Sequence, residues 1–178
     1  MFTNYFSYNA GVAYHYIGGD GLTMDWERAP SVVHDARAHI KESLNAVFDS
    51  VPDFNELLSV GYLPDQAMAF HSDDERGVYP FVAGLSLGSD ATMTFRWKNS
   101  PSDGPRGFLA VNLKHVRTMA AMTTALMLMH SAKGDILLMD GKDFQTTFQH
   151  SVTPISFRIA VTARVIDSES IGPTGRIA

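Results

Sequence analysis

The sequence predicts a mainly β fold with flanking helices, of the α+β class, whose core is a double-stranded β-helix or jelly roll. Most apolar segments are short and are bounded by Gly, Pro, Asp and Ser, as strands are. These segments do not alternate with helices, as the strands of a parallel sheet would. The chain has 178 residues, 45% of them hydrophobic, which is enough for one domain with a sizeable core.

The first third of the chain is expected to contain a strand and a long helix. Residues 12–17 alternate and predict a strand, which the glycine-rich segment 18–21 ends. Pro30 and Ser31 predict the start of a helix, and Pro52 lies in the segment that ends it. Apolar residues recur every three or four positions in this helix and form one stripe, which we expect to cover the back of a sheet. They are Val33, Ala36, Ile40, Leu44 and Val47.

The remaining chain consists mainly of segments with the composition of strands. Pro64 and Asp65 mark a turn between the first two, and residues 88–90 mark a turn that predicts a β-hairpin. The expected strands cover residues 56–62, 68–71, 79–87, 91–97, 108–113, 136–139 and 157–166.

Residues 118–133 form a Met-rich segment that we expect to be a helical insertion. Its alanines, leucines and methionines favour a helix, which Gly134 would stop. One interpretation is a packed helix whose methionines fill irregular gaps in the core. The other is an adaptable lid or a self-association surface.

Composition excludes several classes of protein. The chain has no cysteine, so disulfide frameworks, zinc fingers and iron–sulfur clusters are excluded. No signal-like start and no apolar span of membrane length are present, so we expect a soluble intracellular protein of the cytoplasm or nucleus, without a membrane partner. The net charge of −5 lacks the basic footprint of proteins that bind duplexes, although a local basic face would be compatible with it.

A candidate metal site begins with His71 and Asp73. These residues are two positions apart, so on an extended strand their side chains would share a face. His150 is the best candidate for a third ligand. Two imidazoles and one carboxylate leave coordination positions open on ferrous iron, and an arginine such as Arg158 can hold a co-substrate carboxylate nearby. The alternative is a chance pairing, because short motifs recur in unrelated proteins.

Six sequence blocks follow one another in the order seen in AlkB-like iron and 2-oxoglutarate dioxygenases, and over residues 8–166 the chain resembles that family. Upstream, residues 10–16 and Trp26 are similar to the family's substrate-covering region, and Tyr62 and Pro64 to the residues ahead of its iron ligands. The six blocks are His71–Glu75, Gly84–Gly88, Thr94–Arg96, Gly134–Met139, His150–Val152 and Arg158–Arg164.

The resemblance implies that residues 1–178 form one dioxygenase domain using Fe(II), 2-oxoglutarate and dioxygen. His71, Asp73 and His150 would then be the catalytic iron ligands. Arg158 would pair with the distal carboxylate of 2-oxoglutarate in a bidentate contact. Three further residues would bind the co-substrate: Arg164 near the metal-bound end, Thr162 on the same strand face, and Tyr62.

The resemblance also implies a substrate, a base carrying an alkyl group on nitrogen, in DNA or RNA. Residues 1–30 would cover it, with Tyr14, Tyr16 and Trp26 available for stacking on a base extruded into the pocket. Two acids after the iron ligand, Asp74 and Glu75, would contact its polar edge. Hydroxylation of the alkyl carbon would yield an adduct that releases formaldehyde.

Two positions depart from the family pattern. Val60 and Ala160 stand where the family often has asparagine, so two polar contacts to the co-substrate are absent. Two other functions therefore stay open. One is a hydroxylase or demethylase of a small molecule or a protein side chain, and the other is a binding domain without catalytic activity.

Overall fold

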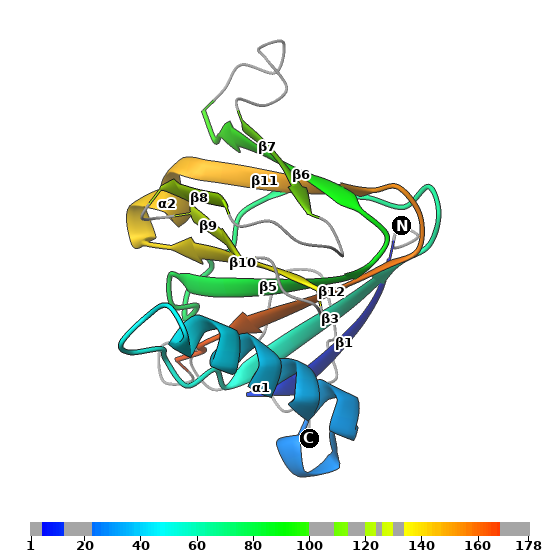
Figure 1. Ribbon diagram of the computed structural model, residues 1–178, viewed down its shortest axis with the longest axis vertical. Coiled ribbons are helices and arrows are strands. Elements are labelled where there is room, and N and C mark those ends of the chain that lie inside the picture. Colours follow the sequence, from blue (N-terminus) through cyan, green and yellow to red (C-terminus); the bar gives the residue numbers. More distant parts are fainter. Residues whose placement is uncertain are drawn as a thin grey trace, which may run out of the picture.

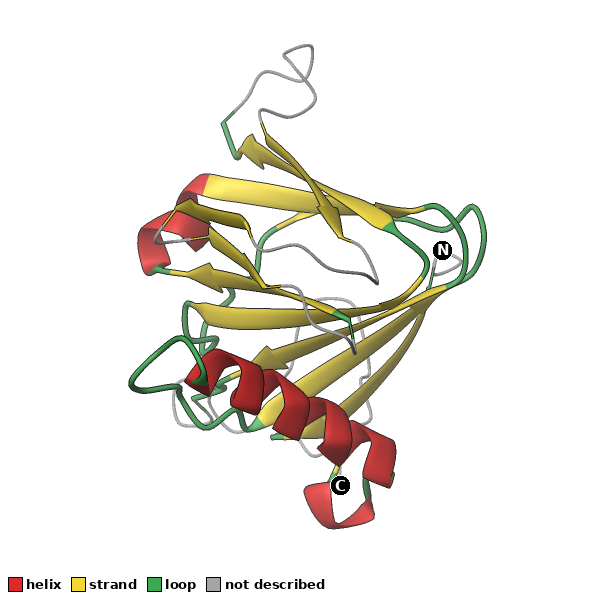
Figure 2. Ribbon diagram, in the orientation of Figure 1, coloured by secondary structure: helices red, strands yellow, loops and turns green. Residues whose placement is uncertain are grey.

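Two β-sheets face each other, and one long helix covers the outer face of the larger sheet (Figure 1). This computed structural model describes residues 5–12, 23–99, 109–113, 120–123, 126–129 and 134–167. The layers of strand are evident in Figure 2. The expected mainly β, jelly-roll fold is confirmed.

The larger sheet has eight strands in the order β2-β1-β3-β12-β5-β10-β9-β8. Their bounds are Phe6–Gly11 for β1, Thr23–Met24 for β2, Glu56–Tyr62 for β3, Phe81–Gly88 for β5, Ala120–Thr123 for β8, Leu126–Met129 for β9, Asp135–Asp140 for β10 and Arg158–Arg164 for β12.

The smaller sheet has four strands in the order β4-β11-β6-β7. Their bounds are Met68–His71 for β4, Ala91–Trp97 for β6, Leu109–Leu113 for β7 and Phe148–Pro154 for β11. The helices are the 3-10 helix η1 at Trp26–Arg28, α1 at Ser31–Asn45 and α2 at Lys142–Thr147. None of the helices in the described part of the chain is both long and apolar enough to span a membrane.

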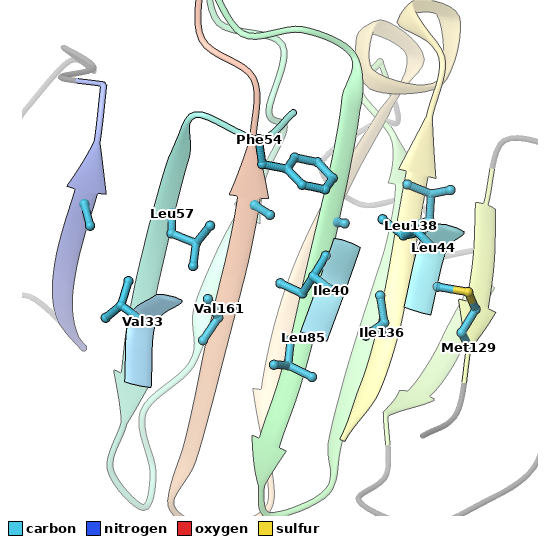
Figure 3. Close-up of a cluster of buried hydrophobic side chains, with 13 residues drawn as sticks. Val33, Ile40, Leu44, Phe54, Leu57, Leu85, Met129, Ile136, Leu138 and Val161 are labelled. Atoms are coloured by element: carbon cyan, nitrogen blue, oxygen red, sulfur yellow. The ribbon is translucent and has the colours of Figure 1, made fainter. Parts of the chain in front are cut away.

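Helix α1 begins where Pro30 and Ser31 predicted it. Its buried residues Val33, Ile40 and Leu44 pack on the outer face of the larger sheet (Figure 3). Val47 lies beyond the end of the helix and is about half exposed, so the predicted stripe stops before it. On the sheet the helix meets apolar residues from several strands, including Leu57, Leu85, Ile136, Leu138 and Val161.

The expected hairpin at residues 88–90 is wrong. Strand β5 belongs to the larger sheet and β6 to the smaller one. Both edges of β5 are already occupied, because it pairs with β12 on one side and β10 on the other. The turn therefore carries the chain from one sheet to the other, and β6 pairs with β11 and β7 instead.

The turn at residues 88–90 is bonded to the second turn between the sheets, residues 155–157. The Ser89 N–H donates to the carbonyl of Phe157 at 2.9 Å, and the Ile155 N–H donates to the carbonyl of Asp90 at 2.9 Å. Gly88 has a φ of +85°, and a Cβ there would lie 2.8 Å from the Phe157 carbonyl oxygen. Glycine is therefore required at this close approach.

The helix expected at residues 118–133 is also wrong where the structure describes this segment. Strands β8 and β9 are present instead, and β9 pairs with β10 in the larger sheet. Leu126 and Leu128 pack between the sheets, whereas Met127 and Met129 pack on the side of α1. A strand with apolar residues on both faces has no polar alternation, so its composition resembled that of a helix.

The other expected strands are present, some with shifted ends. Of the strand expected at residues 12–17, only Val12 is described, and it follows β1. Helix α2 was not predicted, because its short polar sequence carries no apolar stripe.

Replacement of Ile40 by alanine should test the packing of α1. Ile40 is fully buried, and its truncation is expected to lower the free energy of unfolding by about 2–5 kcal/mol. The half-exposed Val47 provides the control, since Val47→Ala should change stability by less than about 0.5 kcal/mol. Urea unfolding measures both values. Equal effects of the two substitutions would contradict the placement of the helix.

Candidate metal centre and co-substrate site

His71, Asp73 and His150 lie together between the sheets. His71 ends β4, and His150 lies directly opposite it on β11, with ring centroids 4.2 Å apart. Asp73 follows β4 in a loop, and its Oδ2 lies 3.6 Å from Nε2 of His150. The expectation that Asp73 would share a strand with His71 is wrong, but the loop brings its carboxylate to the same place. One ligand atom from each residue lies within 4.8 Å of the others.

Both imidazoles can offer a lone pair to a metal. Burial lowers the pKa of His150 to about 4, with the nearby His71 acting in the same direction and Asp73 opposing it. His150 is therefore neutral near pH 7. Nδ1 of His71 lies 2.8 Å from the carbonyl oxygen of Ala69, which only accepts hydrogen bonds. Nδ1 thus carries the proton, and Nε2 is left for a metal.

The wall beside the three residues is formed by two paired strands, β3 and β12. Alternate residues of each strand face the space between the sheets. The antiparallel register sets these residues directly opposite one another in four pairs, which are Tyr62 with Arg158, Val60 with Ala160, Leu58 with Thr162, and Glu56 with Arg164. The wall therefore has an arginine near each end and a largely apolar middle.

Arg158 is a buried cation with unused hydrogen-bonding capacity. Its Nε donates to Oγ of Ser86 at 3.1 Å, and its guanidinium carbon lies 5.5 Å from the centre of the Tyr62 ring. Its Nη1 is buried and has no hydrogen-bond partner among the described residues. Burial lowers the pKa of Arg158, but an arginine remains charged near pH 7. An anion in the cavity would satisfy this donor.

The cavity in front of Arg158 also contains the candidate metal ligands. Burial raises the pKa of Tyr62 to about 12, so its phenol stays protonated and can donate to an anion. The cavity is lined by Tyr62, Arg158 and Thr162 from the wall, by His71, Asp73 and His150, and by apolar residues that include Val60, Met93, Leu137 and Ala160. The structure thus gathers eight residues that the sequence singled out, six as candidate ligands and co-substrate contacts, and Val60 and Ala160 as departures from the family pattern.

Arg164 is engaged differently from Arg158. Its Nε and Nη2 each donate to a carboxylate oxygen of Glu56 at 2.8 Å, and both side chains are buried. Arg164 also lines a vestibule of about 180 Å³ together with the candidate metal ligands His71 and Asp73. The other lining residues of the vestibule are Tyr5, Leu58, Val60, Met68, His71, Asp73 and Glu75.

Trp26 does not lie near the metal ligands. It packs with α1 on the outer face of the larger sheet, where the guanidinium carbon of Arg37 lies 4.9 Å from the centre of its ring. The expectation that Trp26 stacks on a substrate is therefore not supported. Tyr14 and Tyr16, which were expected to share this role, lie outside the described residues.

Asp74 and Glu75 have different surroundings. Asp74 forms an ion pair with Lys98 and accepts a hydrogen bond from Oγ of Ser72 at 2.6 Å. Burial opposes ionisation of Asp74, but these two donors hold its pKa below the usual value. Glu75 faces the vestibule, and burial raises its pKa. Of the two acids, only Glu75 lines the vestibule.

Sequence reasoning missed Tyr5, Glu56 and Ser86. Glu56 could have been predicted from the sequence, because it is a charged residue at the start of a mainly apolar strand. Tyr5 and Ser86 could not, since a single tyrosine or serine is common in any strand.

Loss of one candidate ligand should strongly weaken metal binding. Replacement of His150 by alanine is expected to weaken Mn(II) binding by more than about tenfold, because even residues that only orient metal ligands contribute 10–100-fold. Titration followed by electron paramagnetic resonance measures the free ion. His34→Ala is the control, because His34 lies on α1 and bonds to the carbonyl of Trp26. Unchanged affinity in His150→Ala would contradict the site.

The sequence of this chain matches one protein-family model. The family described as the 2OG-Fe(II) oxygenase superfamily matches residues 7–171. Among solved structures, one titled "The structure of OsALKBH1" is similar with a TM-score of 0.44 and 16% identity. The match covers 76% of this chain but only 60% of that one. No curated protein matches the sequence. Because the family match spans nearly the whole described chain, this protein belongs to the 2OG-Fe(II) oxygenase superfamily, with His71, Asp73 and His150 as its candidate iron ligands.

Proposed function

We propose that this oxygenase oxidatively removes alkyl groups from ring nitrogens of nucleobases in DNA or RNA. One observation carries the catalytic part of the proposal. Arg158, whose buried Nη1 has no hydrogen-bond partner among the described residues, lines the same cavity as His71, Asp73 and His150. An anion receptor and a set of metal ligands in one cavity suit a co-substrate that bridges the two.

The residues present fit an iron ion. Two imidazoles and one carboxylate suit ferrous iron and leave positions for other ligands. Bound iron supplies the oxidation, in which dioxygen and 2-oxoglutarate yield succinate and carbon dioxide while one oxygen atom enters a C–H bond of the substrate. The resulting N-hydroxymethyl group decomposes to formaldehyde and the free base nitrogen.

Arg158 and Tyr62 are assigned to the distal carboxylate of 2-oxoglutarate. Arg158 supplies a charge-assisted donor, and Tyr62 supplies a protonated phenol on the paired residue of β3. Ser86 orients the guanidinium by accepting from its Nε. Thr162 lies on the same wall closer to Arg164 and is assigned to the other end of the co-substrate.

The vestibule is assigned to the substrate. Leu58, Val60 and Met68 give it apolar walls that exclude water, and Tyr5 adds an aromatic ring. Bases alkylated on a ring nitrogen beside an amino group carry a positive charge near neutral pH. Glu75 at the vestibule provides a carboxylate that would favour such a charge. These features support a flat, cationic heterocycle as the substrate.

A second candidate substrate is a small molecule or a protein side chain. Several of the described cations outside the cavity of Arg158 lie beside acids. Lys98 is paired with Asp74, and Arg76 and Lys142 line a cavity together with Glu75 and Asp167. Binding of a nucleic acid depends strongly on cations that neutralise phosphates. This balance favours a substrate without phosphates.

Substitution of Arg158 tests the co-substrate assignment. Arg158→Lys should weaken 2-oxoglutarate binding by about tenfold to 100-fold, because lysine cannot reproduce a bidentate contact and a charged hydrogen bond contributes about 1.5–3 kcal/mol. Calorimetry on the Mn(II)-loaded protein measures the affinity without turnover. Arg37→Lys on α1 is the control and should bind normally. Equal binding by Arg158→Lys and the unsubstituted protein would exclude this anchor.

A comparison of substrates tests the nucleobase assignment. Formaldehyde release should occur with oligonucleotides that contain 1-methyladenine or 3-methylcytosine, and not with the unmethylated oligonucleotides. The assay at low and high salt reports whether phosphate contacts contribute, since such contacts weaken with salt. Release from the free methylated nucleosides but not from oligonucleotides would favour the small-molecule alternative. No release from either form would exclude the nucleobase assignment.

A further inference from the structure

The two arginines of β12 lie on the same face of the strand but differ in their hydrogen-bond partners. Arg158 has a buried donor without a partner among the described residues, whereas Arg164 is held by both carboxylate oxygens of Glu56. Six residues separate them, which is roughly 20 Å along an extended strand. We therefore expect the two arginines to have different roles, although both face the space between the sheets.

The contact between Glu56 and Arg164 is fixed by the fold. The two residues are directly opposite each other in the ladder of β3 and β12. Beside them, the Asn55 amide donates to the carbonyl of Ile166 at 2.8 Å and accepts from the N–H of Ile166 at 2.7 Å. The Asn55 N–H also donates to the carbonyl of Arg164 at 3.1 Å. The ends of β3 and β12 that carry Glu56 and Arg164 are thus joined by the ladder and by the hydrogen bonds of Asn55.

Glu56 compensates the charge of Arg164 in a site with almost no access to water. The exposed fractions of the two residues are 0% and 3%. A buried charge is strongly unfavourable unless it is paired, and a bidentate carboxylate contact satisfies two guanidinium nitrogens at once. An incoming anion would have to compete with this contact. Arg158 meets no such competition.

Arg164 nevertheless acts on the metal site. It lines the vestibule together with His71, Asp73 and Glu75. Burial opposes its charge, but Glu56, Asp73 and Glu75 raise the pKa of Arg164. The guanidinium is therefore a permanent cation near the carboxylate ligand Asp73, and Glu56 moderates its effect on the metal.

We propose that Glu56 is a positioning residue that holds Arg164 beside Asp73 and keeps it from binding the co-substrate, so that Arg158 is the only arginine anchor for 2-oxoglutarate. This inference rests on the proposed co-substrate site. Between the two arginines, Val60, Ala160 and Leu58 offer no side-chain donor to a co-substrate carboxylate, and Thr162 offers a hydroxyl but no charge.

Opposite effects of two single substitutions distinguish positioning from a general structural role. 2-Oxoglutarate binding is measured by calorimetry on Mn(II)-loaded protein. Arg164→Gln should lose less than about threefold in affinity, whereas Arg158→Gln should lose about tenfold to 100-fold. Glu56→Gln should gain about tenfold, because the released guanidinium can now donate to the co-substrate. The same variant should bind Mn(II) more weakly, because an uncompensated cation lies near Asp73.

Two results would overturn the inference. One is a loss of affinity in Arg164→Gln as large as that in Arg158→Gln, which would make Arg164 a co-substrate anchor. The other is a loss in both Glu56→Gln and Arg164→Gln, as expected if the pair only stabilises the fold. If the unsubstituted protein binds no 2-oxoglutarate, the proposed co-substrate site fails first.

A double variant covers the case in which Glu56→Gln does not fold, since breaking a buried ion pair is strongly destabilising. Glu56→Gln with Arg164→Gln replaces the pair by two amides and leaves no unpaired charge. Its affinity for 2-oxoglutarate should stay within about threefold of that of the unsubstituted protein. A loss of the size seen in Arg158→Gln, in a variant with an unchanged melting temperature, would contradict the inference.

Discussion

The antiparallel pairing of β12 with β3 is the constraint on which the site depends. Its register places Arg158 opposite Tyr62 and Arg164 opposite Glu56. A shift of β12 by one residue would turn Arg158 and Arg164 toward α1 and bring apolar residues to the cavity. The apolar face that packs on α1 opposes such a shift, because Val161 and Ala163 would then leave the core. Packing against α1 on one face of the sheet therefore fixes which side chains reach the cavity on the other face.

The sequence was sufficient to predict the residues that follow a motif. His71, Asp73, His150 and Arg158 could be singled out because their types and order match the metal and co-substrate residues of the family that the sequence resembles. The structure brings these four to one cavity. Pairings between distant strands were harder to predict. The turn at residues 88–90 has the composition of a hairpin turn, and only the occupied edges of β5 show that it connects two sheets.

Two other errors have related physical causes. The segment Leu126–Met129 is apolar on both faces because one face meets the second sheet and the other meets the side of α1, so the two-residue period disappeared from its composition. Trp26 lies in the segment that was expected to cover the substrate. Its sequence position does not show on which face of the larger sheet it packs, and the structure places it beside α1 on the outer face. Glu56 was overlooked because its partner Arg164 is distant in sequence and had already been assigned to the co-substrate.

The bonded turns at residues 88–90 and 155–157 join the two sheets along one seam. Arg158 lies next to this seam, opposite Gly88, whereas Arg164 lies at the far end of the same strand. A side chain at residue 88 would collide with the Phe157 carbonyl, directly before the residue that carries the buried guanidinium. The absence of a side chain at Gly88 is therefore a condition for the placement of Arg158 at the start of β12.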